Sequence, residues 1–123
     1  MEQGEASTES VDGKVVSQLR KGVLEYCVLA QLREGPRYGV ELLDGLSSVK
    51  VMTTSQGTIY PLLTRLRRDR SVDTFLRESP SGPARRYYTL TATGRAALAE
   101  FTASWPPFRE AVDHFITSGG THS

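Results

Sequence analysis

Apolar residues recur at helical spacing in the segment from Ser17 to about Arg33, "SQLRKGVLEYCVLAQLR". Ser17 is a candidate N-cap, and Gly35 followed by Pro36 predicts the end of this helix. One apolar stripe is formed by Leu19, Val23, Tyr26, Cys27 and Ala30, and further apolar residues cover much of the remaining surface at Leu24, Val28, Leu29 and Leu32. A helix that is apolar on several sides is buried on more than one of them. We therefore expect a second subunit to cover the side that carries Leu24, Val28 and Leu32.

Two shorter helices follow in the pattern. The segment "YGVELLDGLSS" predicts a helix from about Tyr38 to Ser47, with apolar residues at Val40, Leu43 and Leu46. The segment "TTSQGTIYPLLTRLRRDR" predicts a helix from Gln56 to Asp69, with Thr54 or Ser55 as the N-cap. Pro61 should perturb this helix, because proline lacks the N–H of a backbone hydrogen bond.

The predicted helix 56–69 has two unlike faces. Its core-facing stripe consists of Ile59, Leu62, Leu63 and Leu66. At 100° per residue the opposite face is polar and cationic, and it carries Gly57, Tyr60, Pro61, Thr64, Arg65 and Arg68.

Between positions 71 and 94 the apolar period changes from helical to extended. β-Branched and aromatic residues flank the turn-forming cluster "SPSGPA", which predicts a hairpin with strands at about 72–77 and 85–90 and a loop longer than two residues. Arg85 and Arg86 would then lie at the foot of the loop. Tyr87 and Tyr88 alternate across the strand, and we expect Tyr88 and Leu90 to point inward.

From Thr91 onward a heptad seam predicts a last helix. Its members recur at spacings of 3, 4, 3, 4 and 3 and are Leu98, Phe101, Trp105, Phe108, Val112 and Phe115. Pro106 and Pro107 should kink or split the helix, although the seam continues in phase through both. Trp105 either lines a ligand pocket or packs in this seam.

The charge is distributed unevenly along the 123 residues. The segment 50–95 holds nine basic and three acidic residues, a net charge of +6, while the rest of the chain holds six basic and eleven acidic residues, a net charge of −5. Such a basic segment is typical of a surface that binds a polyanion, although a solvated helix face would have the same composition.

Several other function classes have little support in the sequence. No apolar run approaches the ~18 residues of a membrane span, and the acidic N-terminus "MEQGEASTESVDG" is unlike a signal peptide, so a cytoplasmic protein is expected. The single cysteine, Cys27, lies in an apolar run without metal-ligand spacing. His114 and His122 have no catalytic partner at a suitable spacing, and "SGPARR" lacks the features of a P-loop. We therefore expect no enzymatic activity, no cofactor and no metal.

The order of elements predicts a mainly α-helical fold with a small β-hairpin. We expect a tail at 1–13, a winged helix-turn-helix domain at 14–90, a C-terminal dimerisation helix at 91–118 and a second tail at 119–123. A helix anchored on one face and cationic on the other can enter the major groove of DNA, with the hairpin beside it.

Three blocks of the sequence also resemble a known family. "VLEYCVLAQLREGPRYGVELLDGL", "TSQGTIYPLLTRLRRD" and "GPARRYYTLTATG" are similar, in this order, to the signature blocks of PadR-family transcriptional regulators. The likeness spans about Leu19 to Phe115. One departure follows the third helix, where the family usually has a glycine and an apolar pair and this chain has Arg70, Ser71 and Val72.

The resemblance implies a dimeric repressor that binds an inverted-repeat operator in double-stranded DNA through its third helix and wing. It also implies that a small hydrophobic or aromatic effector could release the protein from DNA. The DNA-binding residues it implies, together with Arg68 of the polar face, are Thr54, Ser55, Gln56, Thr58, Tyr60, Thr64, Arg65, Ser81, Gly82, Arg85 and Arg86. The expected dimer interface is Leu24, Val28, Leu32, Leu98, Phe101, Trp105, Phe108, Val112 and Phe115.

Two alternatives stay open at the level of sequence. Tyr60 either contacts a DNA phosphate or packs its ring beside the core. The whole domain could also serve as a winged-helix protein-interaction or dimerisation module without specific DNA binding.

Overall fold

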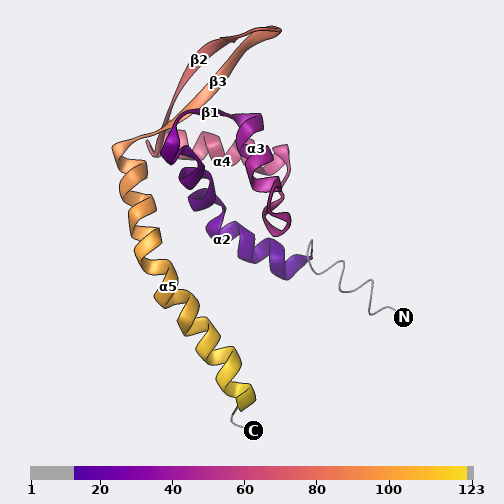
Figure 1. The fold of residues 1–123 in the computed structure, drawn as a ribbon, viewed down its shortest axis with the longest axis vertical. Helices are drawn as coiled ribbons and strands as arrows, with labels where there is room; N and C mark the ends of the chain where they lie inside the picture. Colours follow the sequence, from indigo (N-terminus) through magenta and orange to yellow (C-terminus); the bar gives the residue numbers. More distant parts are fainter. Residues whose placement is uncertain (1–12, 122–123) are drawn as a thin grey trace, which may run out of the picture.

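The computed structural model describes residues 13–121, so most of the tail expected at 1–13 and the end of the tail expected at 119–123 lie outside this range. The chain order of the elements is α2 (Lys14–Gln31), the 3-10 turn η1 (Leu32–Glu34), β1 (Arg37–Tyr38), α3 (Gly39–Ser47), the 3-10 turn η2 (Lys50–Met52), α4 (Gln56–Arg68), β2 (Val72–Ser79), β3 (Gly82–Leu90) and α5 (Ala92–Thr121). The mainly α-helical fold with a small sheet, as predicted, is a winged helix-turn-helix followed by a long helix (Figure 1).

The first helix begins earlier than the predicted cap. Gly13, in an extended conformation, is the N-cap of α2, and Ser17 lies inside the helix with its N–H donating to the Gly13 carbonyl at 2.9 Å. At the other end Gly35 has φ +148°, a conformation that favours glycine. The Arg37 Nε donates to the Gln31 carbonyl at 2.9 Å and satisfies one of the last free carbonyls of α2.

The sheet has three strands in the order β1-β3-β2, all antiparallel. The prediction of a loop longer than two residues is wrong, because Ser79 pairs with Gly82 and only Pro80 and Ser81 form the turn. Between the pairs Arg77–Arg85 and Ser79–Gly82, β3 has one residue more than β2, and the irregularity of the ladder accommodates it. Both strands are therefore longer than predicted, and β1 was not predicted.

The core lies where α2, α3 and α4 meet the base of the sheet. Tyr88 is buried and Leu90 packs against the core, as predicted, and burial raises the pKa of the Tyr88 phenol. In α3 Leu46 is buried and Leu43 packs against the core, as predicted, whereas Val40 is 42% exposed and Leu42 is buried instead. The buried core consists of Leu24, Val28, Leu29, Leu32, Leu42, Leu46, Ile59, Leu63, Leu66, Val72, Tyr88 and Leu98.

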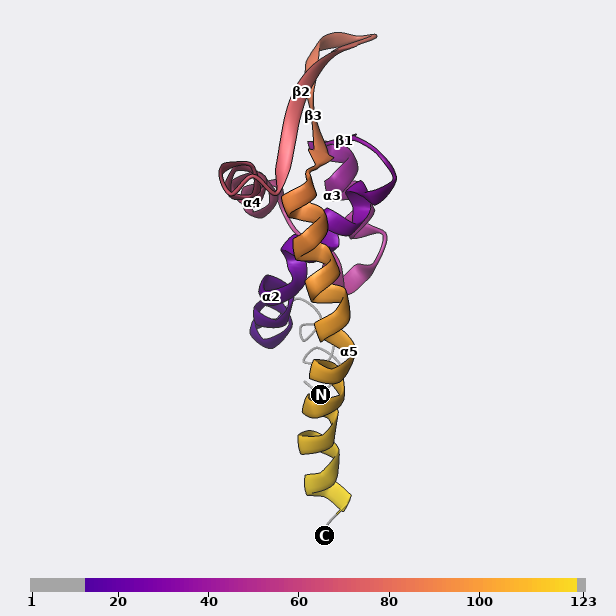
Figure 2. The same ribbon diagram turned by 90° about the vertical axis from the view of Figure 1, so that its left-hand side faces the viewer.

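The last helix is unbroken. α5 runs from Ala92 to Thr121 through Pro106 and Pro107, so the split considered for this helix is wrong and its predicted end at residue 118 is three residues too early. Figures 1 and 2 show α5 extending from the domain in the direction opposite to the β2–β3 hairpin. Among residues 13–121, no helix has the length and apolar character of a membrane span.

Candidate nucleic-acid interface

Helix α4 is anchored by one face and leaves the other free. Ile59, Leu63 and Leu66 are buried, as predicted, and the predicted bounds are correct to within one residue, with Asp69 as the C-cap. The polar residues of the first turns, Gln56, Thr58 and Tyr60, are exposed. Figure 2 shows α4 beside the base of the hairpin, so both elements belong to one side of the molecule.

The start of α4 is formed by the predicted cap region. Ser55 has extended dihedral angles, and its carbonyl accepts the N–H groups of Thr58 and Ile59 at 3.0 Å each. The Ser55 hydroxyl donates weakly to the Thr58 hydroxyl at 3.4 Å, and Thr54 is half-buried. The helix N-terminus therefore presents small hydroxyl side chains and the Gln56 amide to solvent.

The Tyr60 ring packs against the domain, as one of its two alternatives expects, and stays partly at the surface. Its ring lies so close to Gly39 that a Cβ at position 39 would come within 2.6 Å of the Tyr60 Cε1 atom. The side chain of Tyr60 is nevertheless at the surface, with 36% of the residue exposed. Gly39 thus allows the ring to pack on the start of α3 while the residue stays accessible.

Two cations in the second half of α4, Arg65 and Arg68, form ion pairs. The Arg65 Nη2 lies 3.0 Å from the Glu25 Oε1 on α2, and the Arg65 Nη1 lies 3.7 Å from the Asp69 Oδ2. The Arg68 Nε lies 3.6 Å from the Asp69 Oδ1. Arg65, one of the predicted DNA-binding residues, is therefore engaged with α2. The Thr64 hydroxyl also has a partner within α4, because it donates to the Tyr60 carbonyl at 3.0 Å.

The wing presents its predicted residues on different faces. Ser81 and Gly82 form the exposed tip, where the Ser81 N–H donates to the Ser79 hydroxyl at 3.4 Å. Arg85 and Arg86 are consecutive in β3 and so point to opposite faces of the sheet. The prediction that both lie at the foot of the loop is wrong, because they pair with Arg77 and Leu76 inside the ladder.

Sequence reasoning missed the aromatic neighbours of these wing cations. The Arg85 guanidinium lies 4.5 Å from the ring centre of Tyr38, and the Arg77 guanidinium lies 4.5 Å from that of Tyr87. On the other face the Arg86 Nη1 donates to the Thr74 hydroxyl at 3.1 Å. The predicted strands 72–77 and 85–90, paired end to end, place 75 opposite 87 and 77 opposite 85, and this alternation could have indicated the shared face.

A compact junction joins α4, β2 and α5. Arg70 has φ +66°, and the N–H groups of Arg70 and Ser71 donate to the carbonyls of Arg67 and Leu66 at 3.0 and 2.9 Å. This is the Schellman arrangement, which usually has a glycine at the position of Arg70. Arg70 therefore replaces the glycine that the family usually has after this helix, and the turn that ends α4 still forms.

The same junction fixes the start of α5. The Thr91 hydroxyl lies 2.6 Å from the Arg70 carbonyl and 2.9 Å from the Ser71 carbonyl, and it accepts the Gly94 N–H at 3.0 Å. Thr91 is thus the N-cap of α5 and connects this helix to the end of α4.

Four residues of the expected dimer interface lie in the core of their own chain. Leu24, Val28 and Leu32 are 5%, 0% and 2% exposed and belong to the core of their own chain, so the face of α2 assigned to a partner was wrong. The exposed apolar residues of α2 are Val15 and Leu19, at 68% and 67%. Leu98 also lies in the core, which anchors the start of α5.

The rest of the α5 seam forms an aromatic row that becomes more exposed toward the C-terminus. The Phe101 ring stacks on Tyr26 of α2 at 4.3 Å and on Trp105 at 5.7 Å, and Trp105 in turn lies 6.4 Å from Phe108. Phe108 and Phe115 are 62% and 75% exposed. A groove of about 790 Å³ runs between α2, η2 and α5, lined by residues that include Leu19, Val23, Met52, Phe101 and Trp105.

Comparisons with known proteins agree with this architecture. The family model described as the transcriptional regulator PadR-like family matches residues 28–100. A PadR-like transcription factor from Bacteroides fragilis is 42% identical, with 82% of this chain and 97% of that chain covered and a TM-score of 0.69. A PadR family transcriptional regulator from Eggerthella lenta is 30% identical, with 90% and 96% covered and a TM-score of 0.77. PadR of Bacillus subtilis, solved in complex with operator DNA, is 24% identical, with 65% and 45% covered and a TM-score of 0.59, a likeness of fold alone.

Proposed function

Because this chain belongs to the PadR-like family of transcriptional regulators, we propose that it represses transcription by binding an inverted-repeat operator in duplex DNA as a twofold homodimer. One observation carries the proposal: α4 is held in the core by Ile59, Leu63 and Leu66 and leaves a polar face exposed beside a cationic hairpin. A complex of Bacillus subtilis PadR with operator DNA, a relative in fold, supports duplex DNA as the partner.

Different residues of α4 contact the bases and the phosphates. The first turns of the helix enter the major groove, which is about 12 Å wide, where the Gln56 amide suits the edge of an adenine. Arg65 suits a guanine, and to reach it the guanidinium exchanges Glu25 for the base. Tyr60 contacts a phosphate, and the wing residues Arg85 and Arg86 lie over the flanking backbone.

The homodimer uses the exposed aromatic row of α5. Phe108 and Phe115 are largely exposed in the single chain, and burial of one such ring contributes about 1.5–3 kcal/mol. The complementary surface of the partner is its own α5 together with the exposed Val15 and Leu19 of α2. This surface replaces the one at Leu24, Val28 and Leu32 that the sequence predicted.

A small hydrophobic or aromatic effector fits the groove between α2 and α5. The groove is lined mainly by apolar side chains, and Trp105 is among them. Because Trp105 is the single tryptophan of the sequence, its fluorescence reports occupancy of the groove directly. An effector that binds there lies between the DNA-binding domain and the dimerisation helix, where it can change the spacing of the two α4 helices.

Selection from random duplex DNA tests the proposed function. We expect enrichment of an inverted repeat whose half-sites are about one helical turn, roughly 34–36 Å, apart. The affinity for this duplex should fall steeply with added salt, because phosphate contacts release counterions. Enrichment of no inverted repeat would contradict an operator-binding dimer and favour a winged-helix interaction module.

A further inference from the structure

The outer face of the β2–β3 hairpin carries a row of rings and guanidinium groups, which we call the wing platform: Tyr38, Phe75, Arg77, Arg85 and Tyr87. Phe75 and Tyr87 are register partners and stack with ring centres 5.4 Å apart. The Tyr38 ring packs edge-on against Tyr87 at 5.4 Å. The three rings therefore form a continuous aromatic surface across all three strands.

Two arginines lie on this surface directly opposite each other. Arg77 and Arg85 are register partners, so their side chains leave the same face of the sheet as neighbours. The Arg77 guanidinium carbon lies 4.5 Å from the Tyr87 ring centre and 5.2 Å from that of Phe75. The Arg85 guanidinium carbon lies 4.5 Å from the Tyr38 ring centre.

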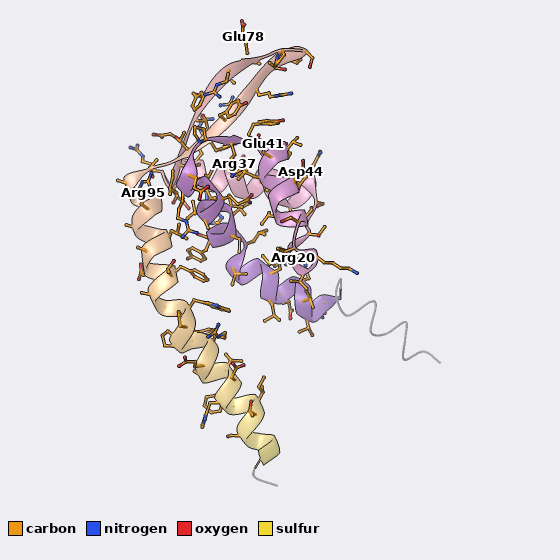
Figure 3. The ribbon with its side chains drawn as sticks, in the orientation of Figure 1. Arg20, Arg37, Glu41, Asp44, Glu78 and Arg95 are labelled. Carbon is orange, nitrogen blue, oxygen red and sulfur yellow. The ribbon has the colours of Figure 1, made fainter. Side chains whose placement is uncertain are left out.

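Nothing in the described part of the chain neutralises this pair. Within residues 13–121 neither guanidinium makes an ion pair or a hydrogen bond. The adjacent acidic residue, Glu78, lies at the irregularity of the hairpin and projects outward from its far end in Figure 3. Like charges directly opposite each other across two strands destabilise a sheet, so this arrangement favours an anion between them.

The stacking leaves the arginines suited to one kind of anion. A guanidinium that lies over a ring uses its flat face for the contact, and its five N–H donors remain available in the plane. Two such forks next to each other match the oxygens of a phosphate group, which arginine binds in a bidentate manner. The rings also restrict both long side chains before binding, which lowers the entropy lost on contact.

We propose that Arg77 and Arg85 together hold one backbone phosphate of the DNA, with Tyr38 and Tyr87 as positioning residues. The inference rests on the proposed operator binding and adds Arg77, which the sequence analysis did not assign to DNA. It also separates Arg85 from its neighbour Arg86, which points to the opposite face and donates to Thr74.

The salt dependence of binding tests whether the two arginines share a phosphate. The probe is the duplex that wild-type protein selects from random sequence, and the variants are Arg77→Ala, Arg85→Ala and the double variant. A lost phosphate contact lowers the slope of log affinity against log salt by about 0.9. Because the twofold dimer carries two wings, a phosphate shared within each wing makes the double variant lose about 1.8 in total, with the same preferred sequence as wild type. A loss of about 3.6 would show two separate phosphates in each wing, and an unchanged slope would show none; either result overturns the shared site.

Two further variants separate this inference from general charge effects and from the proposed function. Lys21→Ala removes an exposed cation of α2, outside the wing, and should leave the slope unchanged. Wild-type protein that binds no duplex DNA overturns both the shared phosphate site and the proposed function. Normal wild-type binding with an unchanged slope in the double variant overturns the phosphate site alone.

The positioning role of the rings has its own readout. Tyr87→Phe keeps the ring under Arg77, so its affinity and the ring-current shift of the Arg77 side-chain protons should match wild type. Tyr87→Leu should lose that shift and bind the selected duplex several-fold more weakly. Equal affinities of the two variants would show that the rings do not position the arginines.

Discussion

The Arg65 guanidinium of α4 forms an ion pair with the Glu25 carboxylate of α2, with 3.0 Å between Nη2 and Oε1. The side chains are 42% and 28% exposed, so the pair lies at the edge of the interior. Pairs in such positions stabilise a fold by about 0.2–1 kcal/mol, which is small compared with a good base contact of about 1–3 kcal/mol. Arg65 can therefore stay paired with Glu25 in the free protein and exchange Glu25 for a base when DNA binds.

Glu25→Gln should strengthen binding to the operator. The substitution removes a competitor for Arg65 and one negative charge, while the free energy of unfolding should fall by less than about 1 kcal/mol. Arg65→Ala in the same assay should relax the sequence preference at one base position. Affinities measured by fluorescence anisotropy on the selected duplex and on single-base variants of it check both outcomes. An Arg65→Ala protein with full preference at every position would limit Arg65 to a link between α4 and α2.

Arg70→Gly should stabilise the fold. Arg70 has φ +66°, and a residue with a Cβ in this conformation costs roughly 1–2 kcal/mol relative to its ordinary conformations. After the greater flexibility of glycine in the unfolded chain is subtracted, we expect the free energy of unfolding to rise by about 1 kcal/mol. Urea denaturation measures the change. Arg70→Ala is the matched control, because it removes the same charge and keeps the Cβ, and its stability should stay close to that of wild type.

Gly94→Ala should disrupt the junction between α4 and α5. A Cβ at Gly94 would overlap the carbonyl oxygen of Ser71, a backbone atom held by the Thr91 contacts, and would also approach Leu90. Overpacking of this kind costs about 1–3 kcal/mol. Gly57→Ala is the control, because a Cβ there meets nothing closer than the Ser55 hydroxyl at 3.7 Å. Thermal unfolding of the two variants should show a lower midpoint for Gly94→Ala alone.

The Cys27 thiol should react slowly in the folded protein. Burial raises the pKa of Cys27 above its ordinary value of 9.0, so the folded chain favours the protonated thiol. The raised pKa stabilises the folded state as long as the thiol is protonated. This contribution to the free energy of unfolding is complete below pH 9 and is lost as the pH rises through the folded-state pKa. At pH 8 alkylation by iodoacetamide should be slower in buffer than in urea. Equal rates per mole of cysteine would show that the thiol is not protected.

Helix α4 and the C-terminal seam could be predicted because their signals are local. A cap at Ser55, a stripe of leucines and a clear stop at Asp69 determine where α4 begins and ends. The faces of α2 could not be separated in the same way, because apolar residues occur on several sides of the helix. Glu25, which meets Arg65 of α4, cannot be distinguished in the sequence from an ordinary surface charge. Leu24 and Val28 are buried in the core, whereas Leu19 is exposed.

The wing and its platform depend on contacts that single positions do not reveal. The turn at Pro80 and Ser81 lacks the usual glycine-containing pair, so the loop looked longer than it is. The predicted strands 72–77 and 85–90 are compatible with the pairing of Arg77 and Arg85, but no single position indicates the irregularity that combines this register with a two-residue turn. Similarly, β1 has only two residues, Arg37 and Tyr38, and forms because Tyr87 and Tyr88 of β3 are available to pair with it.

Trp105→Ala should weaken the homodimer and, through it, DNA binding. Trp105 lies in the middle of the aromatic row of α5, between Phe101 and Phe108, and twofold symmetry removes the ring twice. Burial of one large ring contributes about 1.5–3 kcal/mol, and Trp105 is 37% exposed in the single chain, so dimerisation can bury about a third of each ring. Because each 1.4 kcal/mol is a factor of ten, the dimer dissociation constant should rise about tenfold for the two rings. Sedimentation equilibrium measures this constant without DNA. Glu100→Ala, an exposed substitution on the same helix outside the seam, is the control and should dimerise as wild type does. A wild-type chain that stays monomeric at micromolar concentration would contradict the dimer, and with it the paired half-sites on DNA.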